Sequence, residues 1–190
     1  MKTLQTERLL LRPFTQEDAA CVAKICNDEN IWRGTLNLPH PYPQECAEAW
    51  IARHEEQFKN ETQFVFAITE KDGGALCGCV SVSHDGENHN GELGYWIAHE
   101  KWGRGYATEA ARAALDFCFR EKRYHRVYAR HYASNPASGR VMQKLGMTRE
   151  GVQKEHILKD GSYKDVVLYG LVAPHETKPV PPFSPDGGTR

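Results

Sequence analysis

Two glycines separated by one arginine, Gly103-Arg104-Gly105, stand directly before the clearest helix pattern in the chain, Tyr106 to Glu121. Five alanines raise the helix propensity of that segment. Its apolar stripe consists of Ala107, Ala111, Ala114, Leu115 and Cys118. The first amides of a helix have no partners within the helix, and the helix dipole adds partial positive charge there. The turn therefore favours a site for an anion such as a phosphate, although a sharp corner in the chain would use the same glycines.

Two other phosphate-binding motifs fit this stretch less well. A P-loop ends in Gly-Lys-Ser or Gly-Lys-Thr, and this ending is absent from the sequence. The dinucleotide-binding fingerprint requires a third small residue where Thr108 stands, and a first strand within a βαβ unit. The turn is therefore interpreted as an anion cradle of another kind.

The distribution of charge along the chain agrees with an anionic ligand near this turn. Residues 101–149 carry eleven Lys and Arg against three Asp and Glu, whereas residues 1–100 carry eight against sixteen. We expect an anionic ligand on the middle segment and a cationic one facing the first half, although a solvated basic face would give the same pattern. The formal net charge of −1 argues against a nucleic-acid-binding protein.

The length of 190 residues suits one domain, which we expect to span residues 1–174. The Pro/Gly-rich segment 175–190 has no periodicity and is expected to be a flexible tail. No stretch approaches the roughly 20 apolar residues of a membrane span, and the start has no apolar core of a secretory signal, so we expect a cytoplasmic protein. The six cysteines lack zinc-type spacing and are expected to be mostly buried and reduced, with no metal site.

The order of the predicted elements indicates an α/β (α+β) fold. Strands are expected at 8–14, 64–69, 75–83, 91–98, 125–133, 148–158 and 163–172, and helices at 15–26, 43–58, 106–121 and 135–145. Asp-Gly pairs between the middle strands are typical of antiparallel hairpins. Residues 31–43 contain three prolines and a glycine and are expected to form a loop that could serve as a lid. We therefore predict a mixed, mostly antiparallel central sheet with helices on both faces.

Four short motifs, in order along the chain, resemble the GNAT superfamily of acyl-coenzyme A N-acetyltransferases. They are Glu92–Ile97 (ELGYWI), Trp102–Ala110 (WGRGYATEA), Asn135–Ser138 (NPAS) and Lys144–Met147 (KLGM). The opening Thr6–Arg12 (TERLLLR) and the run Pro41-Tyr42-Pro43 are most similar to the RimJ/RimL group of ribosomal-protein N-terminal acetyltransferases. The resemblance covers about residues 4–172, and it implies the GNAT fold and acetyl-CoA as the acetyl donor.

The resemblance also implies that the glycine turn binds the pyrophosphate of coenzyme A. The family pattern is Gln/Arg-x-x-Gly-x-Gly/Ala, but here Glu100-Lys101-Trp102 precede the first glycine without a clear Gln or Arg. We therefore expect the contacts to come mainly from backbone amides between Gly103 and Thr108. The pantetheine arm is implied to lie between strands 92–98 and 125–133, pairing as a strand would. The implied cofactor-binding residues are Tyr95, Trp96, Ile97, Gly103, Arg104, Gly105, Tyr106, Ala107, Thr108, Asn135, Ser138 and Lys144.

Acetyl transfer to an amine requires a neutral nucleophile, a polarised carbonyl and protonation of the leaving thiolate. Glu92 matches the carboxylate that family members often use as a base, although it could instead only begin a strand or pair with an arginine. A backbone N–H near Tyr95 to Ile97 could polarise the carbonyl. Many family members have an acidic tyrosine where Met142 stands. The RimJ/RimL pattern Asn-x-x-Ser, matched by Asn135 and Ser138, implies that Ser138 or its bound water lies beside the sulfur, unless Ser138 is only a first-turn residue.

Trp32 and Tyr42 of the 31–43 loop, together with Glu92, are expected to contact the acceptor. The resemblance favours a protein or peptide N-terminal α-amine that attacks directly in a ternary complex. The alternatives are a small-molecule amine, such as a polyamine, an antibiotic or an amino acid derivative, and a non-catalytic module that binds acetyl-CoA. No nucleic-acid or membrane partner is expected. The chain is expected to be a monomer or a homodimer, since the two terminal strands could offer an edge for pairing.

Overall fold

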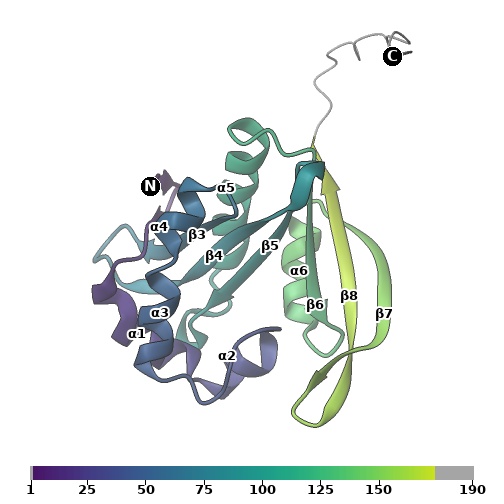
Figure 1. Cartoon of the computed structure of the whole chain (residues 1–190), viewed down its shortest axis with the longest axis horizontal. Coiled ribbons are helices and arrows are strands. Elements are labelled where there is room, and N and C mark those ends of the chain that lie inside the picture. Colours follow the sequence, from purple (N-terminus) through teal and green to yellow (C-terminus); the bar gives the residue numbers. More distant parts are fainter. Residues whose placement is uncertain (1, 174–190) are drawn as a thin grey trace, which may run out of the picture.

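The central sheet has eight strands in the order β1-β2-β3-β4-β5-β6-β8-β7 (Figure 1). In the computed structural model, which describes residues 2–173, neighbouring strands are antiparallel except for β5 and β6. The strands are β1 Leu4–Gln5, β2 Leu9–Arg12, β3 Gln63–Glu70, β4 Leu76–Asp85, β5 Asn90–Ile97, β6 Arg126–Tyr132, β7 Thr148–Lys159 and β8 Ser162–Val172. The prediction of a mixed, mostly antiparallel sheet is confirmed. The predicted tail, 175–190, lies outside the described residues.

Helices cover both faces of this sheet, as the sequence predicts (Figure 1). They are α1 Ala19–Cys26, α2 Glu29–Gly34, α3 Gln44–Ile51, α4 His54–Lys59, α5 Tyr106–Arg120 and α6 Pro136–Lys144. On one face, α1 and α3 pack against inward side chains of β3 and β4. On the other face, the alanine-rich stripe of α5 and the apolar side of α6 share a second core with the opposite side chains of the sheet. Among the described residues, no helix is long and apolar enough to cross a membrane.

The alternation of side chains along β4 gives its two faces different characters. Val80 and Val82 point into the core beneath α5. Cys79, Ser81 and Ser83 lie on the opposite face, toward α1 and α3. Because side chains of a strand alternate between faces, the sequence Cys-Val-Ser-Val-Ser produces one apolar face and one face that is partly polar.

Local capping signals set the ends of α5 and α6. Gly105, with φ of +83°, precedes the first residue of α5. The side chain of Asn135 caps α6 by accepting a hydrogen bond from the Ser138 amide, and Pro136 is the first helical residue. Gly146, with φ of +83°, follows the end of α6. The sequence predicts each of these features.

Two segments differ from the prediction. Residues 29–34 form the short helix α2, so the expected loop 31–43 is shorter at its start. Asp28 caps α2 by accepting the Asn30 amide at 2.8 Å, a signal that the proline-rich stretch after it obscured. The expected continuous helix 43–58 is divided into α3 and α4 at Ala52 and Arg53. Both residues keep right-handed helical backbone angles, so the break is a local tightening without a Gly or Pro to announce it.

Candidate active site

The sheet opens between β5 and β6, its parallel pair. The two strands pair only from Asn90 with Arg126 to Glu92 with Tyr128. Beyond these pairs β5 stays with β4 and β6 stays with β8, so the two halves of the sheet separate (Figure 1). The family resemblance implies that a strand-like ligand arm lies in this gap.

Backbone groups of β5 face this gap. The amide of Ala98 donates to the Cys77 carbonyl of β4 at 2.8 Å. Because N–H directions alternate along a strand, the amides of Ile97 and Tyr95 point away from β4 and toward the gap. The Ile97 carbonyl is already engaged, since the Trp102 indole N–H donates to it at 2.6 Å. Because they point away from β4 and have no acceptor in the described residues, the amides of Tyr95 and Ile97 are available to an extended ligand.

The glycine turn has the geometry of an anion cradle. Gly103 and Gly105 have φ of +75° and +83°, values in the left-handed region that favours glycine. The backbone amides from Gly103 to Thr108 find no hydrogen-bond acceptor within the described part of the chain. The first amide with a partner is that of Glu109, which donates to the Gly105 carbonyl at 3.1 Å. Successive open amides at the start of a helix attract an anion.

Side chains beneath the turn hold it in place. Glu70 accepts hydrogen bonds from Lys101 at 2.9 and 3.0 Å and from the Tyr106 hydroxyl at 2.8 Å, and these bonds lower the pKa of Glu70. The Tyr106 side chain is therefore buried under the turn, and its amide is among those without a partner in the described residues. On the other side, Arg8 donates to the Arg104 carbonyl at 3.0 Å and to Glu109 at 2.8 Å. The Arg104 side chain is half exposed, 3.9 Å from Glu70.

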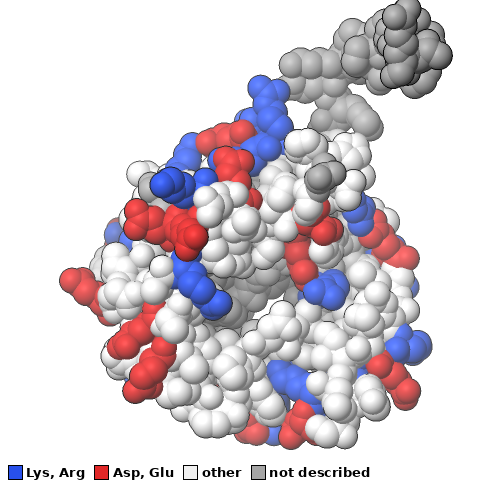
Figure 2. Space-filling model, viewed as in Figure 1, with Lys and Arg blue, Asp and Glu red and all other residues white. Residues whose placement is uncertain are grey.

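A cavity of about 680 Å³ opens beside the gap on the face of α1 and α3 (Figure 2). It is lined by the polar face of β4, by the last residue of α2 with the segment 35–39 after it, and by the rings of Tyr42, Trp50 and Trp96. Ser138 and Met142 also line it, although they belong to α6 on the opposite face of the sheet. The gap between β5 and β6 therefore connects this cavity with the other side of the sheet.

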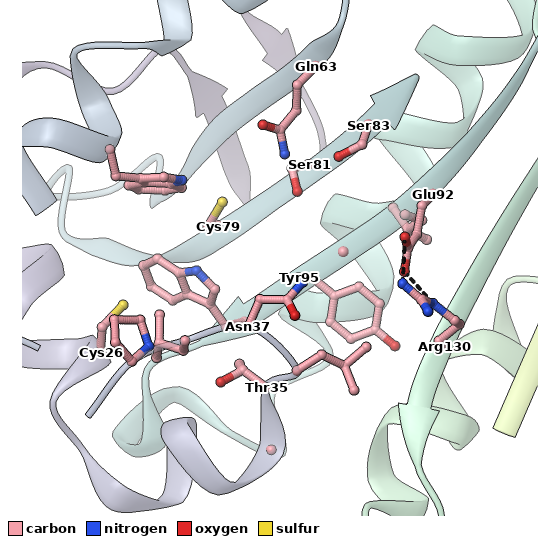
Figure 3. Close-up of a pocket in the computed structure, with 18 of the residues that line it drawn as sticks. Cys26, Thr35, Asn37, Gln63, Cys79, Ser81, Ser83, Glu92, Tyr95 and Arg130 are labelled. Atoms are coloured by element: carbon pink, nitrogen blue, oxygen red, sulfur yellow. Dashed lines mark hydrogen bonds and ion pairs between the residues drawn. The ribbon is translucent and has the colours of Figure 1, made fainter. Parts of the chain in front are cut away.

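Glu92 and Arg130 face each other across the gap, one from β5 and one from β6 (Figure 3). The Arg130 guanidinium donates to both carboxylate oxygens, at 2.8 and 3.0 Å. The carboxylate raises the pKa of Arg130, so the guanidinium stays charged. The arginine partner that the sequence left open is thus present, and Glu92 still lines the cavity.

Tyr95 and Ser138 form a second link across the gap. The Tyr95 hydroxyl donates to the Ser138 carbonyl at 3.0 Å and lies 2.9 Å from Ser138 Oγ. A tyrosine hydroxyl has one hydrogen, so in this arrangement the serine hydroxyl donates to the tyrosine oxygen. Burial raises the pKa of Tyr95 to about 12, which keeps the phenol neutral. This link connects β5 to the first turn of α6.

The other predicted site residues are divided between the cavity and its surroundings. Trp96 and the buried Tyr42 line the cavity. Asn135, besides capping α6, donates to the Gly34 carbonyl at 3.4 Å. Trp32 does not line the cavity, because its ring packs 5.1 Å from the His40 ring and 4.8 Å from Lys159 Nζ. Lys144 is exposed at the end of α6, where its carbonyl accepts from Arg112 at 2.7 Å.

The expectation that acidic groups of the first half face the ligand is wrong for this cavity. Among the lining residues that the structure describes, Glu92 is the one carboxylate, and Arg53 and Arg130 are also present. The acidic surplus lies instead on exposed positions, including those of α3 and α4. Pattern counts over a hundred residues do not distinguish the face of a helix that meets solvent from the face that meets a cavity.

Several cavity residues were not singled out from the sequence. They are Arg53, Gln63, Ser81, Ser83 and Arg130. Ser81 and Ser83 had a signal, the period-two alternation with valine in β4. The two arginines had none, because nothing in their local sequence distinguishes them from other surface arginines.

Comparisons with known proteins agree with this geometry. The family model described as "Acetyltransferase (GNAT) domain" matches residues 8–148. Over 171 residues the chain is 32% identical to the uncharacterized N-acetyltransferase YnaD of Bacillus subtilis (strain 168), covering 89% of this chain and 96% of YnaD. It is 30% identical over 183 residues to the [ribosomal protein uS5]-alanine N-acetyltransferase of Escherichia coli (strain K12), covering 92% of each chain. The structure of Mycobacterium smegmatis RimJ in complex with CoA-disulfide has the same fold, with a TM-score of 0.80 at 23% identity and coverage of 90% and 88%.

An open pair of parallel strands beside an anion cradle and a cavity, with these matches, defines an acyl-CoA-dependent transferase. The chain belongs to the GNAT acetyltransferase family and is an N-acetyltransferase of that family. Homologues in this family bind coenzyme A or acetyl-CoA.

Proposed function

We propose that this chain transfers the acetyl group of acetyl-CoA to the N-terminal α-amine of a protein or peptide, by direct attack in a ternary complex. One observation carries the proposal: the gap between β5 and β6 opens beside the cavity that contains Glu92, and the open amides of the glycine turn follow β5 in the chain. Donor and acceptor can thus approach from opposite faces of the sheet and meet in the gap.

The residues on the donor side fit acetyl-CoA. The amides from Gly103 to Thr108 would hold the pyrophosphate, and the left-handed glycines leave no Cβ between the ligand and the backbone. The amides of Tyr95 and Ile97 would pair with the extended arm. When bound, acetyl-CoA supplies an activated acyl group as a thioester.

The residues on the acceptor side would control protons. Glu92, held by Arg130, would take the proton of the attacking amine, directly or through water. A backbone amide of β5 near Tyr95 would polarise the carbonyl. The Ser138 hydroxyl would turn from the Tyr95 oxygen toward the leaving sulfur, or would hold a water there, and the thiolate would take its proton from that group. An α-amine has a pKa of about 8, so roughly one molecule in ten is neutral at pH 7 before any base acts.

The test is an acceptor screen with the purified chain and acetyl-CoA. The panel contains peptides beginning with Ala or Ser, the same peptides with a blocked N-terminus and a free lysine, spermidine, an aminoglycoside and amino acid amides. Coenzyme A release gives the rate, and mass spectrometry locates the acetyl group. We expect acetylation at the α-amine of the unblocked peptides. Faster acetylation of the small amines, or of the lysine in blocked peptides, contradicts the proposal.

A further inference from the structure

The cavity has an unusual charge balance for a site that accepts amines. Of the lining residues described, only Arg53, Glu92 and Arg130 carry full charges. Glu92 and Arg130 neutralise each other at 2.8 Å. Arg53 therefore sets the net charge of the lining, which is positive. Figure 2 shows Lys and Arg side chains at the border of the hollow, with Asp and Glu side chains beside some of them.

Arg53 has no counterion of its own. It stands at the break between α3 and α4 and is exposed, and its side chain makes no ion pair or hydrogen bond with the residues from 2 to 173. Glu55 and Glu56 follow it on α4, but neither lines the cavity or forms an ion pair with Arg53 within the described residues. Burial first, and the Arg53 charge second, lower the pKa of His54 to about 4, and Tyr42 remains a neutral phenol. The guanidinium is thus a free donor group at the cavity wall.

Neutral hydrogen-bonding groups continue from the cavity wall to the gap. Gln63 of β3 pairs in register with Ser83 of β4, and Ser83 pairs with Glu92 of β5, so one polar row crosses three strands. Figure 3 shows Gln63, Ser81 and Ser83 close together on this side of the cavity. Their side chains have no hydrogen-bond partner among the described residues, and each can donate.

A free guanidinium accompanied by neutral donors suits a carboxylate. Arginine binds carboxylates through two parallel hydrogen bonds, and such charge-assisted bonds are stronger than neutral ones. A polycation would find no second carboxylate in the described lining and would meet the charge of Arg53. The volume of about 680 Å³ is in the range of pockets for ligands the size of a few amino acid residues.

We propose that Arg53 forms a carboxylate subsite in the acceptor cavity, and that the preferred acceptor is a peptide α-amine with Asp or Glu within its first three residues. The proposal rests on the function proposed above and specifies its substrate class. Arg53 is thereby a specificity-determining residue that contacts the acceptor at a distance from the reacting nitrogen.

The test uses three peptides that begin with Ala and differ only at the second and third positions, which carry Glu, Gln or Lys. Steady-state rates are compared for the wild-type chain, Arg53→Gln and Arg53→Lys. Arg120→Gln is the matched control, because Arg120 is exposed on α5 outside the cavity and lies 4.0 Å from Asp116. Thermal unfolding of each variant verifies that it is folded.

For the wild-type chain we expect kcat/KM to be about tenfold higher with the Glu peptide than with the Gln peptide, mainly through KM, and lowest with the Lys peptide. Arg53→Gln should reduce the Glu/Gln ratio to about one, Arg53→Lys should retain part of it, and Arg120→Gln should leave it unchanged. Equal rates for the wild-type chain, or a ratio that survives Arg53→Gln, overturn the inference and leave the proposed function standing. No acetylation of any peptide overturns the proposed function, and the carboxylate subsite with it.

Discussion

The ion pair between Glu92 and Arg130 allows the general base to be tested with two variants that break the same contact. Glu92→Gln removes the carboxylate and keeps the shape of the side chain. Arg130→Met removes the guanidinium and keeps the carboxylate. If Glu92 is a base, only the first variant removes the group that takes the proton. If Glu92 only holds Arg130, the two variants should behave alike.

The structural cost of the two variants is expected to be similar. The side chains of Glu92 and Arg130 are 27% and 25% exposed, and their bonds measure 2.8 and 3.0 Å. An exposed pair contributes about 0–1 kcal/mol and breaking a fully buried pair costs about 3–5 kcal/mol, so we expect a loss of about 1–3 kcal/mol for either variant. For a chain of this length each kcal/mol corresponds to roughly 2–4 °C in Tm.

The catalytic cost is expected to differ. A positioned base typically contributes about 10²- to 10⁴-fold, so Glu92→Gln should lower kcat/KM at pH 7 by about 100-fold or more. The affinity for acetyl-CoA should change little, because the glycine turn is at the other end of β5. Arg130→Met should lower kcat/KM by less than about tenfold, through poorer positioning of the carboxylate.

The assay follows coenzyme A release with an Ala-initiated peptide from pH 6 to 9, with acetyl-CoA affinity measured by calorimetry. The deficit of Glu92→Gln should shrink toward pH 9, where the α-amine, with a pKa of about 8, is mostly neutral without help. Equal losses for Glu92→Gln and Arg130→Met would assign Glu92 to holding Arg130. An unchanged rate for Glu92→Gln would remove Glu92 from the mechanism.

Three further predictions concern the cradle, the cavity wall and acid stability. Gly105→Val should weaken acetyl-CoA binding about tenfold or more in a titration, because φ of +83° costs a branched residue about 1–2 kcal/mol; equal affinity would refute the cradle. Lys159→Met removes two hydrogen bonds, to the carbonyls of Trp32 and Thr35, so amide hydrogen exchange in residues 32–39 should accelerate and the KM for the acceptor should rise. Unchanged hydrogen exchange would contradict this. Burial raises the pKa of Asp18, but bonds from Arg12 and from its neighbours outweigh burial and lower it. The ionised Asp18 therefore stabilises the folded state above about pH 4, and this contribution is lost as pH falls through the folded-state pKa. In urea titrations, the free energy of unfolding of Asp18→Asn should fall less steeply with decreasing pH than that of the wild-type chain.

Local signals explain why so much of the fold was predictable. The ends of α6 depend on Asn135, Pro136 and Gly146, which act through neighbouring backbone groups. The last two strands, β7 and β8, follow from alternation and a Lys-Asp-Gly turn. Helix α2 escaped prediction because its cap, Asp28, precedes a stretch whose prolines favoured a loop. Elements defined by contacts within a few residues are thus the ones that sequence reasoning recovers.

From local sequence alone, the candidate site was predictable where its chemistry belongs to the backbone, whereas Glu92 and Ser138, which line the cavity, were expected from the family resemblance. The open amides after Gly103 follow from glycine and helix geometry, which are local. The pair Glu92 with Arg130 and the link between Tyr95 and Ser138 join residues 38 and 43 positions apart. No period or spacing connects such residues, because their meeting depends on the separation of β5 from β6.

The gap between β5 and β6 leaves amides of β5 without partners in the sheet. These amides need water or a ligand as acceptor, which links the stability of the protein to ligand binding. A buried N–H without a partner costs about 1–3 kcal/mol, so the amides of Tyr95 and Ile97 would destabilise the fold if water could not reach them. The gap is continuous with a cavity of about 680 Å³, so water can reach these amides in the free protein. An extended ligand with its own amide groups can replace that water and restore a strand-like ladder. Side chains that filled the gap would therefore remove the proposed binding site and leave backbone groups of β5 without a partner.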